Sequence, residues 1–250
     1  MRLAALQWPC PGRHGSLGRI GFLPEELGFM EDLVMAALGG DEAAVDRLLK
    51  AGADVNHADA NGWTALIGAA RGDHAALIDR LLGAGAKVNH TDAKGMTALM
   101  LAAEGGHVAV ADRLIKAGAE VNHSDNKGKN ALMRAAENRR MEMVDHLLRA
   151  GGNVNHADRR GKTALMRAAL GGDDAMIRLL IGAKADVNRA DANGWTALIC
   201  AAAGDVKLVK RLIDAGADAS RSAKDGLTAL KRASASGHAT VIEALNAAAR

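Results

Sequence analysis

Apolar residues along this chain come in paired short runs that recur at a regular interval. In each pair, a run of the form T-A-L-x-x-A-A is followed by a short break and then by a second run that ends in R-L-L or a similar triplet. Runs rich in Ala, Leu, Ile and Met favour helices, because these residues lose little side-chain freedom in that conformation. The pattern therefore predicts a pair of short helices in each repeating unit.

The repeat interval is 33 residues, and glycines and aspartates mark it. The glycines are Gly62, Gly95, Gly128, Gly161 and Gly194, and the aspartates are Asp59, Asp92, Asp125, Asp158 and Asp191. The decapeptide ADANGWTALI occurs at residues 58–67 and again at residues 190–199, four intervals later. A fixed period of this length indicates a solenoid built from stacked units, of which we count seven.

A full unit has the pattern D-x-x-G-x-T-A-L-x-x-A-A, then a second apolar run, then G-A and V-N. This pattern resembles the ankyrin repeat, in which each unit has two antiparallel helices and a β-hairpin loop. Ala65 and its equivalents stand where the family prefers Pro, and Ile67 stands where it has His. The resemblance covers about residues 24–250 and implies a mainly α ankyrin-repeat solenoid with capping repeats at both ends.

Polar and glycine positions predict where the helices begin and end. The residues Thr64, Thr97, Asn130, Thr163, Thr196 and Thr228 stand at the start of the first helix, where their oxygens can accept hydrogen bonds from free N–H groups. Glycine follows the second helix in most units, as a left-handed C-terminal residue. Lys184 replaces this glycine in the fifth unit, so we expect strain or a different cap there. The sixth unit is one residue shorter, near residues 204–206.

The repeats divide the chain into four segments. We expect a flexible N-terminal tail at 1–22, an N-terminal capping repeat at 23–57, five internal repeats at 58–221 and a C-terminal capping repeat at 222–250. The first capping repeat lacks the D-x-x-G-x-T motif, and we expect it to start at Pro24. The last one has Lys, Arg and Ser where inner units are apolar or small, as expected of an end that faces water.

Composition and charge narrow the functional classes. Aromatic residues make up 2% of the chain, and the net charge is +3, which by itself does not indicate nucleic-acid binding. The two cysteines have no metal-binding spacing, which is typical of a reducing compartment. No apolar stretch is long enough to cross a bilayer or to form a signal peptide. We therefore expect a cytoplasmic protein that acts as a monomer or within a hetero-complex.

No set of residues predicts catalysis, a metal or a cofactor. The G-K-T at residues 161–163 lacks the glycine that a phosphate-binding loop has five residues earlier. The histidines His57, His90, His123 and His156 follow V-N in four successive units. Stacked units lie about 10 Å apart, so these side chains cannot share one zinc ion, whose ligands lie about 2 Å from it. We interpret them as structural hairpin residues, with a pH-dependent or separate ligand role left open.

The variable hairpin tips and the first helices carry the candidate binding residues. In ankyrin proteins these positions form a concave binding surface, as the resemblance implies. The outer tips carry Trp63, Met96 and Trp195 as apolar anchors. The basic candidates are Lys127, Lys129, Arg134, Arg159, Arg160, Lys162 and Arg167. Residues 124–156 have six Lys and Arg against four Asp and Glu, residues 157–189 have seven against four, and residues 1–57 have five against eight.

A basic centre flanked by tryptophans favours protein binding, because Trp and Arg are enriched in interface hot spots. We hypothesise a non-enzymatic interaction scaffold, an adaptor, inhibitor, or immunity or accessory factor, that binds the acidic surface of a partner protein. One alternative is the binding of nucleic acid or another polyanion, which the weak net charge and the lack of aromatic residues in the basic units disfavour. Another alternative is a structural subunit of a larger assembly.

Overall fold

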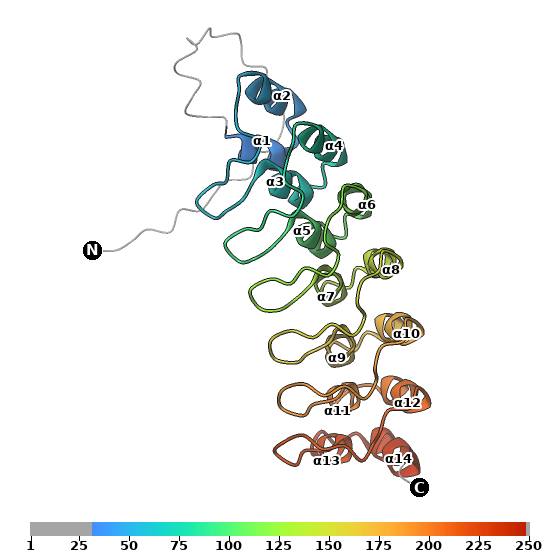
Figure 1. Cartoon of the computed structure of the whole chain (residues 1–250). Coiled ribbons are helices and arrows are strands. Elements are labelled where there is room, and N and C mark those ends of the chain that lie inside the picture. Colours follow the sequence, from blue (N-terminus) through green and yellow to red (C-terminus); the bar gives the residue numbers. More distant parts are fainter. Residues whose placement is uncertain (1–31, 249–250) are drawn as a thin grey trace, which may run out of the picture. The chain divides into compact units, whose positions relative to one another are not determined.

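The structure is a computed structural model that describes residues 32–248, and within this range the chain forms fourteen helices in seven pairs (Figure 1). The first helices of the pairs are α1 (Leu33–Gly39), α3 (Ala65–Arg71), α5 (Ala98–Gly105), α7 (Ala131–Glu137), α9 (Ala164–Leu170), α11 (Ala197–Ala201) and α13 (Ala229–Ala235). The second helices are α2 (Glu42–Lys50), α4 (Ala75–Gly83), α6 (Val108–Lys116), α8 (Met141–Arg149), α10 (Asp174–Gly182), α12 (Val206–Asp214) and α14 (Ala239–Ala248). The predicted helix pairs and the seven units are confirmed.

The predicted capping residues begin the helices as expected. The Thr64 hydroxyl accepts a hydrogen bond from the Ile67 N–H group at 3.4 Å, and the Asn130 side chain accepts one from the Met133 N–H group at 2.9 Å. The first helix α1 begins at Leu33 and is capped by Asp32. The helix start expected at Pro24 and the expected flexible tail lie outside the described residues.

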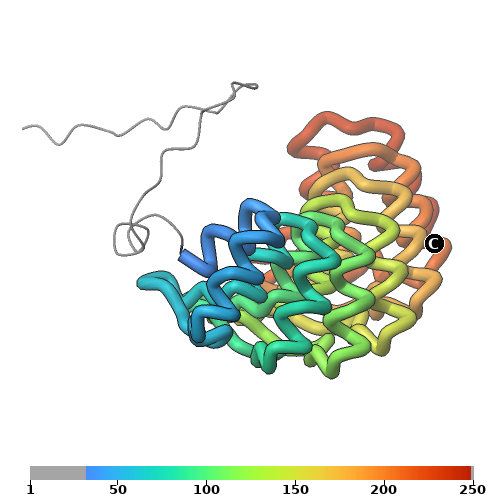
Figure 2. Tube along the Cα trace, turned by 90° about the horizontal axis from the view of Figure 1, so that it is seen from above, coloured from blue at the N-terminus to red at the C-terminus, as the bar shows by residue number. Residues whose placement is uncertain are grey.

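Small residues let the units pack closely. Each first helix contacts the first helices of the neighbouring units, and the second helices form a parallel outer row (Figure 1). At these contacts, Ala69, Ala70, Ala102 and Ala135 are fully buried. One continuous hydrophobic core runs through the described units, and Figure 2 shows successive units following one another along the stack. Stability in such a stack depends on contacts between neighbouring units.

Glycine in the left-handed conformation ends the second helix of most units, as predicted. Lys184 occupies this place in the fifth unit and has a φ of 66°, which side chains with a Cβ rarely adopt. The sixth unit differs as expected too, since α11 has only five residues and α12 begins at Val206. The strain expected at Lys184 is therefore present in its backbone.

We predict that Lys184→Gly stabilises the protein. A left-handed φ costs a residue with a Cβ about 1 kcal/mol, and glycine avoids this cost. The urea unfolding midpoint, followed by circular dichroism, should rise. Lys116→Gly, at a helical position in the last turn of α6, serves as the control and should lower the midpoint. An equal effect of the two substitutions would contradict the strain at Lys184.

The hairpin loops connect successive units and stack through their backbones. In the fifth unit, the Asp158 carboxylate accepts hydrogen bonds from the Arg160 and Lys162 N–H groups, both at 2.9 Å. The Arg159 N–H group donates to the Lys127 carbonyl of the previous loop at 3.0 Å. Residues 32–248 contain no β-strand, only two isolated bridges at the bases of loops. The loops and the exposed sides of the first helices form one surface, which we call the hairpin face.

The recurring V-N-H motif also links neighbouring units. The Asn122 amide donates to the Gly151 carbonyl at 3.0 Å and accepts from the Asn153 N–H group at 2.7 Å. The Nε2 atoms of His90, His123 and His156 lie 3.0, 3.2 and 2.8 Å from the carbonyl oxygens of Gly62, Gly95 and Gly128. The structural interpretation of these three histidines is confirmed, while His57 is exposed.

Candidate functional site

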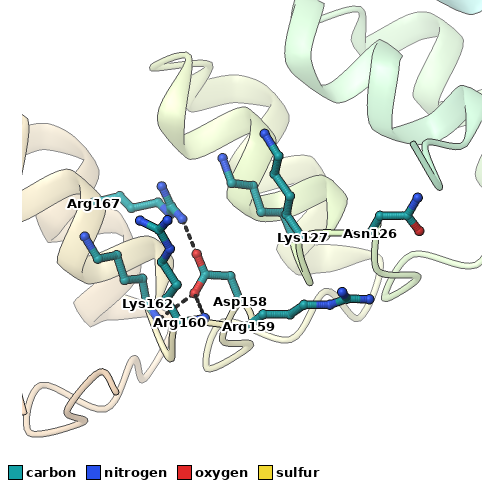
Figure 3. Close-up of a pocket in the computed structure, with 8 residues that line it drawn as sticks. Asn126, Lys127, Asp158, Arg159, Arg160, Lys162 and Arg167 are labelled. Atoms are coloured by element: carbon teal, nitrogen blue, oxygen red, sulfur yellow. Dashed lines mark hydrogen bonds and ion pairs between the residues drawn. The ribbon is translucent and has the colours of Figure 1, made fainter. Parts of the chain in front are cut away.

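A basic hollow of about 440 Å³ opens on the hairpin face between the fourth and fifth units (Figure 3). It is lined by Asn126, Lys127, Lys129, Asp158, Arg159, Arg160, Lys162 and Arg167. All of these side chains are polar, and six of them are cationic. The structure therefore brings six of the seven predicted basic residues together in one concavity.

Four of these cations lack a counter-charge among the residues that the structure describes. Lys127, Arg159 and Arg160 are exposed and Lys162 is half-buried, and none of the four forms an ion pair with the residues that the structure describes. In Figure 3 the Arg159 side chain extends toward Asn126, away from Lys162 and Arg167. Unpaired cations around a concave surface attract anionic groups, and their field is strongest at low ionic strength.

The other cations are held by carboxylates of this chain. Arg167 forms ion pairs with Asp158 and with Glu137 of the previous unit, and Glu137 also accepts from the Lys129 ammonium at 2.8 Å. The Asp158 side chain is only 5% exposed. Lys129 and Arg167 were expected to face the acidic groups of a partner, but they are already neutralised and serve as the wall of the hollow.

One unit earlier, the same arrangement holds Arg134. Its guanidinium pairs with the buried carboxylate of Asp125 and with Glu104. Burial raises the pKa of Asp125, but hydrogen bonds from the Lys129 N–H group and from Arg134 outweigh it, so the pKa is lowered from its ordinary value. Asp125 therefore stays charged at neutral pH, and Arg134, which does not line the hollow, is not free for a partner.

The structure corrects the prediction that three apolar residues project from the hairpin tips. Met96 is only 4% exposed and belongs to the core, so the expectation that it projects from a hairpin tip is wrong. The Asp92 carboxylate binds its N–H group at 2.8 Å, and the side chain packs inward from that position. Trp63 and Trp195 are half-buried against the core. The Arg232 guanidinium also lies 4.6 Å from the centroid of the Trp195 ring, a cation–π contact.

A second, apolar hollow of about 60 Å³ adjoins the basic one. It is lined by Lys162, Met166, Arg167, Leu170, Asp191, Trp195 and Cys200, so the two hollows share Lys162 and Arg167. Burial raises the pKa of the Cys200 thiol to about 11, which keeps it protonated at neutral pH. The thiol therefore acts as a small apolar side chain of the wall.

Leu170, at the end of α9, is a site residue that the sequence interpretation missed. It is 57% exposed, which is unusual for a large hydrophobic residue of this chain. Aligning the units gives the signal that would have found it, because the equivalent positions hold Arg71, Glu104 and Glu137. The first unit also has a leucine there, Leu38, and the sixth has Ala203, so Leu170 stands out only against the second, third and fourth units.

Residues 32–248 offer no site for a metal. No group of three or more His, Cys, Asp or Glu side chains in this range is arranged to hold an ion. A search of the same part of the chain finds no helix long and apolar enough to span a bilayer.

Helix pairs stacked in register, joined by hairpin loops, define a repeat solenoid whose loops carry the candidate site. The family model for ankyrin repeats (3 copies) matches residues 33–125, 121–191 and 168–249, and the chain belongs to the ankyrin-repeat family. Among solved structures, the chain is similar to the human ASB11 ankyrin repeat domain, with a TM-score of 0.77 and 27% identity over 87% of this chain and 97% of that one. No curated protein sequence gives a significant match.

Membership of this family bears on the kind of function. Ankyrin repeats are generally protein–protein interaction modules, and the family is one of non-enzymatic interaction scaffolds. The resemblance inferred from the repeat pattern is thereby confirmed.

Proposed function

We propose that this protein is a cytoplasmic, non-enzymatic scaffold that binds the acidic surface of a partner protein through the basic hollow. The observation that carries the proposal is the group of four cations, Lys127, Arg159, Arg160 and Lys162, that lack a counter-charge in the described residues. The guanidinium groups of Arg159 and Arg160 can each bind a carboxylate through two parallel hydrogen bonds. Arg167 and Asp158 support the hollow and contribute little net charge to it.

Several features favour a protein partner over a nucleic acid. The lining of the basic hollow contains no aromatic side chain on which a base could stack. The second helices of the same two units carry paired charges, such as Arg149 with Asp145 in α8 and Arg178 with Asp174 in α10, so the cationic surface does not extend onto them. A local group of cations matches a local group of carboxylates on a folded or extended partner.

Charge reversal of Arg159 and Arg160 tests this proposal. We expect R159E/R160E to weaken binding of a fluorescent peptide with four Asp and Glu residues at least tenfold, because two attractive contacts become repulsive. The measurement is fluorescence anisotropy at low ionic strength, with a peptide of Gln and Asn in place of the acidic residues as the reference ligand.

The matched control is K50E/K210E, which changes the net charge by the same amount. Lys50 and Lys210 are exposed on the second helices α2 and α12 and, like Arg159 and Arg160, form no ion pair in the described residues. We expect this variant to bind the acidic peptide nearly as the unmodified protein does. Equal losses in the two variants would overturn the assignment of the site. Preferential displacement of the peptide by a single-stranded oligonucleotide of equal charge would favour the nucleic-acid alternative.

A further inference from the structure

We propose that the basic hollow and the adjoining apolar hollow form one composite site for an extended acidic segment of the partner that also carries a small aliphatic side chain. The carboxylates contact the unpaired cations of the basic hollow, and the aliphatic side chain enters the apolar hollow between Leu170 and Trp195. This inference rests on the proposed function and specifies the sequence that the partner presents.

The two hollows adjoin, because two of their lining residues are the same. Lys162 and Arg167 line both of them, and in Figure 3 these side chains lie on the same side of the basic hollow, next to Arg160. Such side chains have an apolar stem and a charged end. The charged end of Lys162 can therefore serve the basic hollow while its stem borders the apolar one. One extended peptide that passes over Lys162 and Arg167 can therefore contact both hollows.

Leu170 supplies exposed apolar surface at this boundary. Single exposed leucines are common in proteins and by themselves indicate nothing. Here, however, Leu170 lies in the apolar hollow and also borders a further hollow of about 260 Å³ beside Glu137 and Asp173. Arg167 lines all three hollows and is held in place by its ion pairs. The leucine therefore stands beside a side chain that is held in place, where a ligand can bury its exposed surface.

The size and the charge of the site define the ligand. A space of about 60 Å³ suits a small aliphatic side chain such as that of valine rather than an aromatic ring. Because the two hollows share Lys162 and Arg167 and an extended segment advances about 3.3 Å per residue, we choose a spacing of two or three residues between the valine and the nearest carboxylate in the test peptides. To match the four unpaired cations, we expect the ligand to carry two or more acidic residues, close enough to one another in sequence to fit in the basic hollow together.

The charge of residues 1–22 makes them a poor occupant of the site. They contain three Arg and no Asp or Glu, and the basic hollow repels a segment of that composition. We assign the occupant to a segment of another protein.

The test compares three fluorescent peptides of equal length with the full chain. The first has an acidic group followed by valine at the proposed spacing, the second has serine in place of that valine, and the third has Gln and Asn in place of the acidic residues. We expect the valine peptide to bind about tenfold more tightly than the serine peptide, because its side chain becomes buried. A fourth peptide with valine before the acidic group covers the opposite chain direction.

Two variants connect the preference to the site. Leu170→Ala should remove the advantage of valine and leave binding of the serine peptide unchanged. Met35→Ala is the matched control, since Met35 is an exposed hydrophobic residue of α1, 59% exposed, in the first unit. It should keep the tenfold preference. Both residues are exposed, so neither substitution should disturb folding.

The outcomes separate the two proposals. A valine preference that Leu170→Ala abolishes and Met35→Ala keeps supports the composite site. If both acidic peptides bind equally, or if the preference persists in Leu170→Ala, the composite site is wrong while the basic site stands. If the acidic peptides bind no better than the neutral one, the proposed function fails, and the composite site fails with it.

Discussion

Asp158→Ala is expected to lower the free energy of unfolding by about 3 kcal/mol, because this buried carboxylate holds both an arginine and two loop N–H groups. Its carboxylate binds the N–H groups of Arg160 and Lys162 and also pairs with Arg167. Removing it leaves two loop N–H groups without acceptors and leaves Arg167 with Glu137 alone. We expect the urea unfolding midpoint to fall and the affinity for acidic peptides to fall with it, because Arg160 and Lys162 lose their positions.

Asp59→Ala is the matched control for this prediction. Asp59 holds its own loop in the same way, through hydrogen bonds from the Asn61 and Trp63 N–H groups at 2.8 Å, but it pairs with no arginine. The loss in that variant should be about 1 kcal/mol, the contribution of ordinary hydrogen bonds. The seventh unit has Ala223 at this position and still forms its loop. Equal losses at Asp158 and Asp59 would show that the ion pair with Arg167 contributes nothing.

Gly128→Ala is expected to be the other strongly destabilising substitution, again by about 3 kcal/mol. Gly128 has a φ of +79°, and an added Cβ would lie 2.7 Å from the backbone nitrogen of Arg159. The strain of a left-handed φ adds to a contact with backbone that cannot move aside without breaking the hydrogen bond from Arg159 to Lys127. Because Lys127 and Arg159 both line the basic hollow, we also expect weaker binding of acidic peptides.

Gly118→Ala separates the two causes. Gly118 has a φ of +91°, but an added Cβ would meet no atom within 4 Å. Its substitution should cost only the strain of the left-handed conformation, about 1 kcal/mol, and leave peptide binding unchanged. Urea unfolding and fluorescence anisotropy measure the two effects. A cost at Gly128 no larger than that at Gly118 would mean that the loops of the fourth and fifth units are not closely stacked.

Much of the fold could be predicted from the sequence because the information is local and is repeated. Thr64 and its equivalents act as caps through hydrogen bonds to residues three positions away, and the loop aspartates bind N–H groups two and four positions away. The strained backbone of Lys184 could be predicted because the equivalent position of every other unit that has one is a glycine. A period of 33 residues makes each such departure visible.

The functional surface was harder to predict because it depends on side chains that meet in space within and between units. Arg167 pairs with Asp158 of its own unit and with Glu137, thirty residues earlier and in another unit. The burial of Met96 depends on the direction that its loop takes, and the exposure of Leu170 depends on the end of α9. The alignment of the units could have drawn attention to Leu170, but it could not have shown the hollow beside it.

The amino-acid sequence by itself determined the seven helix pairs, their caps and glycine ends, and the clustering of basic residues in the fourth and fifth units. Only the tertiary structure decided which of those basic residues keep an uncompensated charge. The physical reason is that periodic hydrogen bonds join residues at fixed separations along the chain, whereas an ion pair forms wherever two opposite charges meet in space. Folding within a unit brings carboxylates to Lys129, Arg134 and Arg167, and stacking adds Glu104 to Arg134 and Glu137 to Arg167. Among the residues that the structure describes, none pairs with Lys127, Arg159, Arg160 or Lys162.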